Sequence, residues 1–132
     1  MSLRSVQRYT VMTAKATTWV GSIIFVWDFR NAVVKIWTAS SANLTVKCQW
    51  AIGNTVPTFT SAQTATNHWD YVQMVDLENW NPINGDTGFV VAGVDDFRLF
   101  EVNVNSLDYL TFNVTARIAG SVTIEITLTD NL

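Results

Sequence analysis

The sequence predicts an all-β protein: a single-domain antiparallel sandwich of two sheets, jelly-roll-like, with about eight or nine strands. Three observations support this prediction. Apolar and polar residues alternate with period two along much of the chain, as in half-buried strands. Val, Ile, Thr and aromatic residues, which favour strands, dominate these runs. No window sustains the apolar spacing of an amphipathic helix with recognisable caps.

The composition fits one folded domain spanning residues 1–132. Hydrophobic residues make up 48% of the chain and charged residues only 14%, a balance that excludes intrinsic disorder. The net charge of −3 makes nucleic acid an unexpected partner, because domains that bind it usually concentrate Lys and Arg. A surface with so few charges is expected to be covered in part by a partner protein.

The first half of the chain is expected to contribute strands at 6–13, 17–27, 32–38 and 44–51. Residues 32–38 and 44–51 read as a pair separated by the small polar stretch 39–43. Gly21 is a candidate kink within 17–27.

The second half is expected to contribute strands at 69–75, 98–104, 107–112, 113–118 and 122–128. The last two alternate strictly and are joined at Gly120-Ser121, which predicts a β-hairpin. Stretches 53–67 and 77–88 show no pattern, and loops of that length are often functional or flexible.

The lack of a recognisable targeting signal and the single cysteine predict a chain that folds without an oxidising compartment. Cys48 lies in an alternating run and is expected to be a buried thiol. The N-terminus lacks the features of a signal peptide, and the apolar segment 19–27 is far shorter than a membrane helix requires. We therefore expect a soluble protein with no membrane partner.

A search for catalytic or metal-binding residues favours a non-enzymatic protein without cofactor or metal. His68 is the only histidine, so a two-histidine metal site is excluded. Asp95 and Asp96 fit a turn whose carboxylates bond nearby backbone. The oxygen-rich stretch 76–86 reads either as a solvated turn or as a structural calcium loop.

Aromatic residues are the main candidates for a binding surface. Of the six tryptophans, three lie within strand patterns and are expected in the core or on a sheet face: Trp27, Trp37 and Trp50. Trp69, Tyr71 and Trp80 lie beside the long irregular stretches, where they serve either an interface or local packing.

The N-terminal segment 1–15 carries a second set of interface candidates. Arg4, Arg8 and Lys15 are basic residues in an otherwise acidic chain. The segment is therefore read as a docking arm for an acidic partner surface or as a solvated edge strand.

Residues 69–129 resemble the small β-sandwich proteins of tailed-bacteriophage virions, such as capsid decoration (cement) proteins and tail-associated jelly-roll modules. The resemblance rests on the order of four sequence features: Trp69-Asp70-Tyr71, the turn Gly85-Asp86-Thr87-Gly88, the strand Phe97-Arg98-Leu99-Phe100, and Gly120-Ser121-Val122-Thr123-Ile124 near the C-terminus.

The resemblance implies a jelly-roll fold and a non-enzymatic role in the virion, assembled in the host cytoplasm. Its implied partners are other copies of the chain in a homo-oligomer and a major capsid or tail protein. The alternative is a carbohydrate-binding or receptor-binding module in which Trp69, Tyr71 and Trp80 stack on a glycan. A small-molecule hydrolase using His68, Asp70 and Asp76 is a third hypothesis.

Overall fold

The computed structural model describes residues 6–94 and 96–130, and in this part of the chain every strand belongs to one antiparallel sheet of ten strands. In chain order the strands are β1 (Val6–Lys15), β2 (Trp19–Val20), β3 (Ile24–Phe25), β4 (Asn31–Ala51), β5 (Asp70–Val72), β6 (Met74–Asp76), β7 (Asn81–Ile83), β8 (Phe89–Val94), β9 (Phe97–Asn103) and β10 (Tyr109–Thr129). Among the described residues, no helix is long and apolar enough to cross a membrane.

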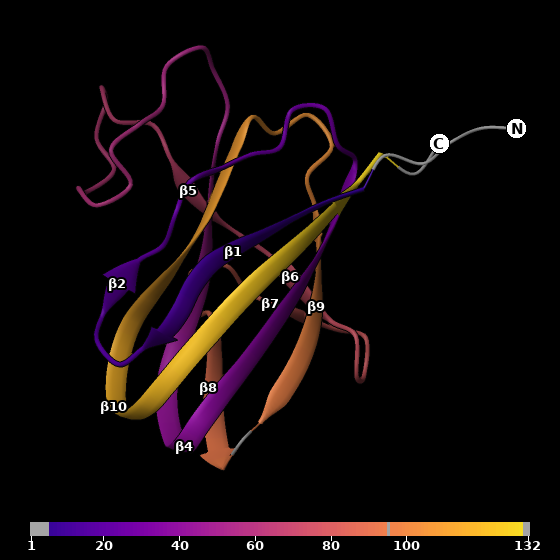
Figure 1. Ribbon diagram of the computed structural model, residues 1–132. Coiled ribbons are helices and arrows are strands. Elements are labelled where there is room, and N and C mark those ends of the chain that lie inside the picture. The colour runs from indigo at the N-terminus through magenta and orange to yellow at the C-terminus, as the bar shows by residue number, and fades with distance from the viewer. Residues whose placement is uncertain (1–5, 95, 131–132) are drawn as a thin grey trace, which may run out of the picture.

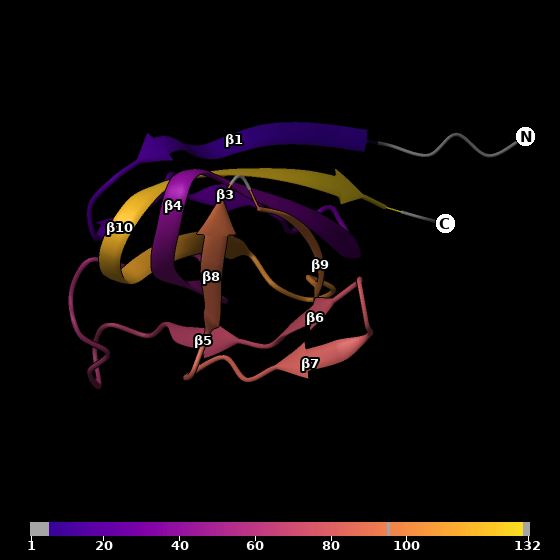
Figure 2. The ribbon, with the colours of Figure 1, turned by 90° about the horizontal axis from the view of Figure 1, so that it is seen from below.

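Two long strands, β4 and β10, organise the sheet. Each has 21 residues, and they pair antiparallel from Asn31 opposite Thr129 to Ala51 opposite Tyr109. The paired strands curl, so that β1 and β10 lie on one side of the molecule and β5, β6 and β7 on the other (Figures 1 and 2).

The curl divides the sheet into two regions, which we name by their position along β4. The first half-sheet contains residues 31–38 of β4 and 121–129 of β10, flanked by β1 on one side and by β9, β6 and β7 on the other. The second half-sheet contains residues 41–51 and 109–119, flanked by β2 and β3 and by β5 and β8.

The hydrophobic core lies on the concave side of the curl. Period-two alternation places the even-numbered residues of β4 and β10 on this side in both half-sheets, and they form one buried cluster whose members include Val34, Ile36, Leu44, Val46, Leu110, Phe112, Ile124 and Ile126. The odd-numbered residues therefore face outward. Burial of one face of both halves is the main stabilising term expected for such a sheet.

The predicted all-β class is confirmed, but the arrangement of strands differs from the prediction. The strands form one curled sheet of ten strands, where a jelly-roll-like sandwich of two sheets with eight or nine strands in total was expected. Long strands that bend can cover both sides of a core without breaking, whereas the sequence pattern shows only the alternation on each side of the bend.

The predicted hairpin at Gly120-Ser121 is wrong. The chain continues through this point as part of β10, with register shifts between Arg117, Ala119 and Ser121. Gly120 has φ +78°, and Arg117 Nε donates a hydrogen bond to the Gly120 carbonyl. A glycine in this conformation serves a bulge as well as a reversing turn, so the local sequence does not separate the two.

Other expected boundaries also shift because of the bend. The stretch 39–43, expected as a connection, lies within β4, and 107–112 and 113–118 are parts of one strand. The expected strand 17–27 is reduced to β2 and β3, and 77–88 contains β7. The stretch 53–67 has no strand, as expected.

Gly120 is expected to be essential for the bend. A Cβ at this position would lie 2.6 Å from Ala42 Cα on the facing strand, and the positive φ disfavours a side chain. We predict that Gly120→Ala lowers the free energy of unfolding by about 2 kcal/mol or more in urea titrations. The neighbouring Ser121→Ala should have little effect, and equal stability of the two variants would contradict this role.

Cys48 is buried, as predicted, at 1% exposure on the concave face of β4. Burial raises the pKa of its thiol well above the ordinary value. We predict that a thiol reagent at about pH 8 modifies the native protein slowly and the urea-unfolded protein rapidly, because little thiolate forms in the native state. Equal rates in both states would show that the strand opens readily around Cys48.

Candidate functional site

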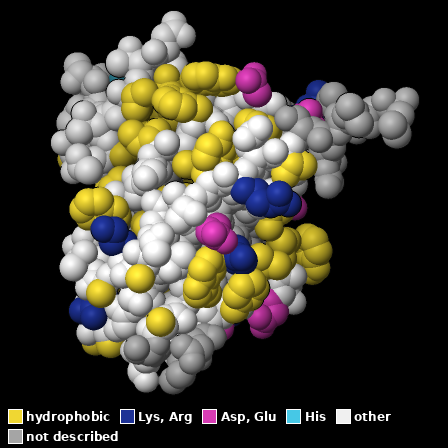
Figure 3. Space-filling model, in the orientation of Figure 1, with side chains coloured by type: hydrophobic (Ala, Val, Ile, Leu, Met, Phe, Trp, Pro, Cys, Tyr) yellow, Lys and Arg dark blue, Asp and Glu magenta, His cyan; other side chains and the backbone are white. Residues whose placement is uncertain are grey.

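The outer face of the first half-sheet carries exposed aromatic and aliphatic side chains. Phe97 and Leu99 of β9 are 55% and 38% exposed, and Phe97 stacks on Trp37 of β4 with ring centroids 6.4 Å apart. We call these three residues the outer apolar patch. Figure 3 shows hydrophobic side chains gathered over β4 and β9 on this face. Alternation with the buried Phe100 places Phe97 and Leu99 outward, so the period-two pattern of this strand is the sequence signal that marks both as surface residues.

Charged residues border this patch. Lys35 Nζ lies 3.2 Å from Glu125 Oε1 and 4.8 Å from the ring centroid of Trp37. Cation–π contact and an exposed ion pair each contribute little to stability, so this arrangement mainly orients the side chains. The result is an apolar surface with one balanced charge pair at its margin.

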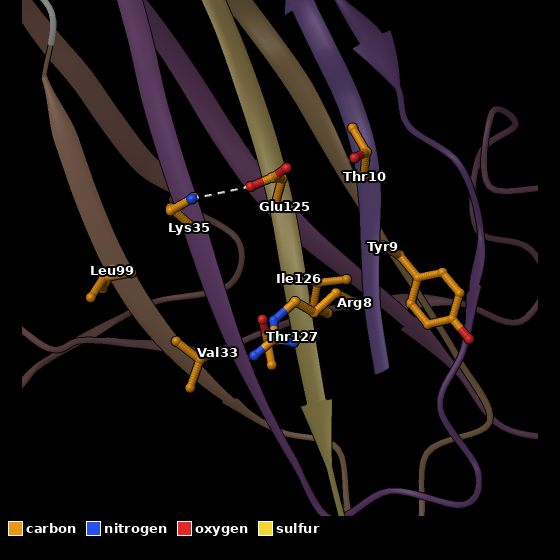
Figure 4. Close-up of a pocket in the computed structure, with 9 residues that line it drawn as sticks. All are labelled: Arg8, Tyr9, Thr10, Val33, Lys35, Leu99, Glu125, Ile126 and Thr127. Carbon is orange, nitrogen blue, oxygen red and sulfur yellow. Dashed lines mark ion pairs between the residues drawn. The ribbon is translucent and has the colours of Figure 1, made fainter. Parts of the chain in front are cut away.

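Arg8 lies on β1, next to a shallow hollow of about 240 Å³ on the same face. Val33, Lys35, Glu125 and Thr127 contribute to the hollow, as Figure 4 shows. Tyr9 points to the opposite side of β1 in this view. Arg8 is thus on the outer face with the apolar patch, whereas Arg4 lies outside the described residues.

A second exposed group, the aromatic corner, surrounds Tyr109 at one end of the sheet. Phe25 and Trp27 are 52% and 56% exposed, and their ring centroids lie 5.5 and 6.1 Å from that of Tyr109. Trp27 was expected in the core or on a sheet face. It follows β3 in a turn instead, so its ring remains open to solvent. Trp37 lies on a sheet face, and Trp50 packs against the main core, as expected.

Residues 53–68 form an ordered cap over the outer face of the second half-sheet. Phe59 is buried there with Ala51 and Tyr109, and its carbonyl accepts a 3.1 Å hydrogen bond from Gln49 Nε2. Asn67 holds the cap closed: its side chain accepts from Thr58 N at 2.8 Å and donates to the Thr58 carbonyl at 2.9 Å. The long irregular stretch is therefore fixed by its own hydrogen bonds.

Trp69 and Tyr71 lie together beneath this cap. The Trp69 indole Nε1 donates to the Ser61 carbonyl at 2.9 Å, and its ring contacts Phe59 and Tyr71 at centroid distances of 6.3 and 5.1 Å. The side chains of Trp69 and Tyr71 are both half-buried. Trp69 thus has a packing role and still presents part of its ring at the surface.

Tyr71 has a partly buried and negatively charged environment. Burial raises the pKa of its phenol, and the negative charges of Asp86 and Asp70 raise it further. Lys47 Nζ lies 4.8 Å from the centroid of the Tyr71 ring. Gly85 packs closely against the Tyr71 backbone: a Cβ added to Gly85 would lie 2.9 Å from the Tyr71 carbonyl carbon. This close contact places the next residue, Asp86, near the Tyr71 side chain.

Trp80 does not join Trp69 and Tyr71. It occupies the turn between β6 and β7, is 70% exposed and has φ +60°. Figure 2 shows this turn at the opposite side of the molecule from β5. The three-residue stacking platform considered from the sequence therefore does not form.

The residues of the hydrolase hypothesis are also separated. His68 and Asp70 line one hollow, whereas Asp76 is 2% exposed and forms a salt bridge with Arg98 of β9, which also lies 3.1 Å from Glu78. Within residues 6–94 and 96–130, no group of three His, Cys, Asp or Glu side chains could hold a metal ion. In the oxygen-rich stretch, Asp76 and Glu78 pair with Arg98, and Asn84 Oδ1 accepts from Asp86 N.

Comparisons with known proteins establish the fold. No protein-family model matches the chain, and no curated protein matches it by sequence. The SPBc2 prophage-derived protein YomS has a similar structure, with a TM-score of 0.70 and 16% identity over 98% of this chain and 96% of YomS. The PBSX exported protein XepA also has a TM-score of 0.70, with 8% identity over 98% of this chain. The match covers 39% of XepA, so this chain corresponds to part of that protein.

The environment of Tyr71 can be tested by titration. We predict that Asp86→Asn lowers the pKa of Tyr71, because it removes a negative charge that opposes the phenolate. The pKa should remain above the ordinary value, since burial is the larger cause. The measurement is tyrosinate absorbance against pH, with Tyr71→Phe as the reference that isolates this residue. An unchanged midpoint would show that solvent screens Asp86.

Proposed function

We propose that this chain is a non-enzymatic structural protein of a bacteriophage, and specifically a decoration or cement subunit of the capsid. In this proposal it lies in the virion, assembles in the host cytoplasm, and packs against other copies of itself and the major capsid protein. Its fold is shared over nearly its whole length with the SPBc2 prophage-derived protein YomS and with the PBSX exported protein XepA, and the prophage origin of YomS supports a phage context. One of these is named as exported, a description that applies to that protein.

The observation that carries the proposal is the outer apolar patch on an otherwise rigid sheet. A large aromatic residue such as Phe97, left 55% exposed at the start of a strand whose Phe100 and Val102 are buried, is unfavourable unless a partner covers it. Burying apolar surface contributes about 25 cal/mol per Å². A modest contact repeated by symmetry around a shell then sums to a large stabilisation.

Low charge supports the same conclusion. Only 14% of the residues are charged, and the patch carries a neutralised pair, Lys35 with Glu125, at its border. Subunit interfaces are depleted in unpaired charge at their centres and polar at their margins. The patch has this composition.

Incorporation into phage particles tests the proposal. We predict that Phe97→Ser reduces the amount of the chain in purified particles at least about tenfold, because interface aromatics of this kind often contribute more than about 1.4 kcal/mol. Mass spectrometry of gradient-purified particles gives the measurement, with cryo-electron microscopy locating the subunit. Phe97 is exposed, so the variant should keep its fold.

The matched control is Val90→Ser, which changes a residue of similar exposure (54%) on β8, outside the patch. It should leave incorporation unchanged. If the unaltered chain is missing from particles, or if both variants are incorporated equally well, a structural role through this face is contradicted.

A further inference from the structure

A shallow, open groove of about 420 Å³ lies between the cap and the outer face of the second half-sheet. Phe59 and Gln63 of the cap form one wall, and Trp69 and Tyr71 lie at its side. Val20 of β2 and Asn113 of β10, which are paired in register, complete it. The groove therefore combines aromatic surface with amide side chains, contributed by four separate segments of the chain.

The polar groups of this groove are only partly used within the protein. Gln63 Nε2 donates to the Trp69 carbonyl at 2.7 Å and to Asp70 Oδ1 at 2.9 Å, which fixes the amide and leaves its Oε1 as an acceptor. The Asn113 side chain forms no hydrogen bond within residues 6–94 and 96–130. The Gln63 amide, which is held in place, and the Asn113 amide, which has no partner among the described residues, can together bind a ligand that both donates and accepts hydrogen bonds.

Gln49 is a buried polar residue of the neighbouring strand β4. It lies in register between Tyr71 and Thr111 on the same outward face, is fully buried, and its Oε1 has no hydrogen-bond partner among the described residues. A buried acceptor without a partner is costly, and water or a ligand hydroxyl usually satisfies it. Gln49 is paired in register with the groove residue Tyr71, but it lies beneath the surface and does not itself line the groove.

The charges near the groove indicate which ligands it admits. Asp70 and Asp86 both act on Tyr71, whose pKa they raise, so the local field opposes a further negative charge. Lys47 offsets this field in part and covers the Tyr71 ring. Because Lys47 covers the Tyr71 ring, Trp69 provides the aromatic ring on which a ligand can stack. The hydrogen bond from its indole Nε1 to the Ser61 carbonyl fixes the orientation of this ring.

We propose that this groove binds a neutral pyranose unit of a polysaccharide, with the sugar packed against Trp69 and its hydroxyl groups bonded to Asn113 and Gln63. The proposal goes beyond the structural role, because the groove lies on the second half-sheet, whereas the outer apolar patch lies on the first. A virion protein could use both surfaces together. Sugars suit this chemistry because they present an apolar C–H face and several hydroxyl groups on one rigid ring.

Calorimetry and amide NMR of the full chain test the proposal with maltotetraose, galactotriose, the N-acetylglucosamine trimer and trigalacturonic acid as probes. At least one neutral probe is expected to bind in the millimolar range or tighter and to shift the side-chain amide of Asn113 and the indole of Trp69. Asn113→Ala should weaken binding about fivefold, the loss of one hydrogen bond. Trp69→Phe should weaken it further.

Trp80→Ala is the matched control, since it removes an exposed tryptophan on the far turn and should leave binding unchanged. Circular dichroism checks that Trp69→Phe remains folded, and Asn113→Ala tests the site independently if it does not. Absence of binding to all three neutral probes overturns the proposal, as does equal binding of the acidic probe or equal loss in Trp80→Ala. Particle incorporation of Asn113→Ala should be normal, so the two proposals fail independently.

Discussion

The structure depends on one constraint: two strands of 21 residues remain paired along their whole length while one face of each is buried. A flat ribbon of that length could not bury one face against itself. The pair therefore curls, and the register shifts near Gly120 absorb the change of direction. Because the alternation keeps its phase through the bend, a single core forms on the concave side from both half-sheets.

The same constraint creates the outward surfaces. Every residue placed inward leaves a neighbour facing out, so a strand rich in aromatic residues must expose some of them. In the second half-sheet, the cap of residues 53–68 covers the outward face and buries Phe59 and Tyr109. In the first half-sheet no described segment covers the outward face, and Phe97 and Leu99 remain exposed. The two halves of one sheet thus differ in what they offer to a partner.

The cap also gives a long loop a fixed surface. Its internal hydrogen bonds through Asn67 give it a fixed shape without strands or disulfides. It holds Trp69 by the indole and brings Gln63 beside it, opposite side chains from β2 and β10. Residues distant in sequence are thereby assembled at a rigid surface, which is the arrangement that selective ligand binding requires.

The sequence by itself determined the strand content and the inward face of each strand. Period-two alternation is a local property, so the buried Cys48 and the inward Val122 and Ile124 follow from the pattern alone. Only the tertiary structure decided whether Gly120 reverses the chain or bends it, because either conformation uses a glycine with positive φ. The tertiary structure also decided that Trp69 and Tyr71 share a groove while Trp80 lies apart. Which segments come close together depends on the curl of the whole sheet, and the local spacing of residues in the sequence does not show it.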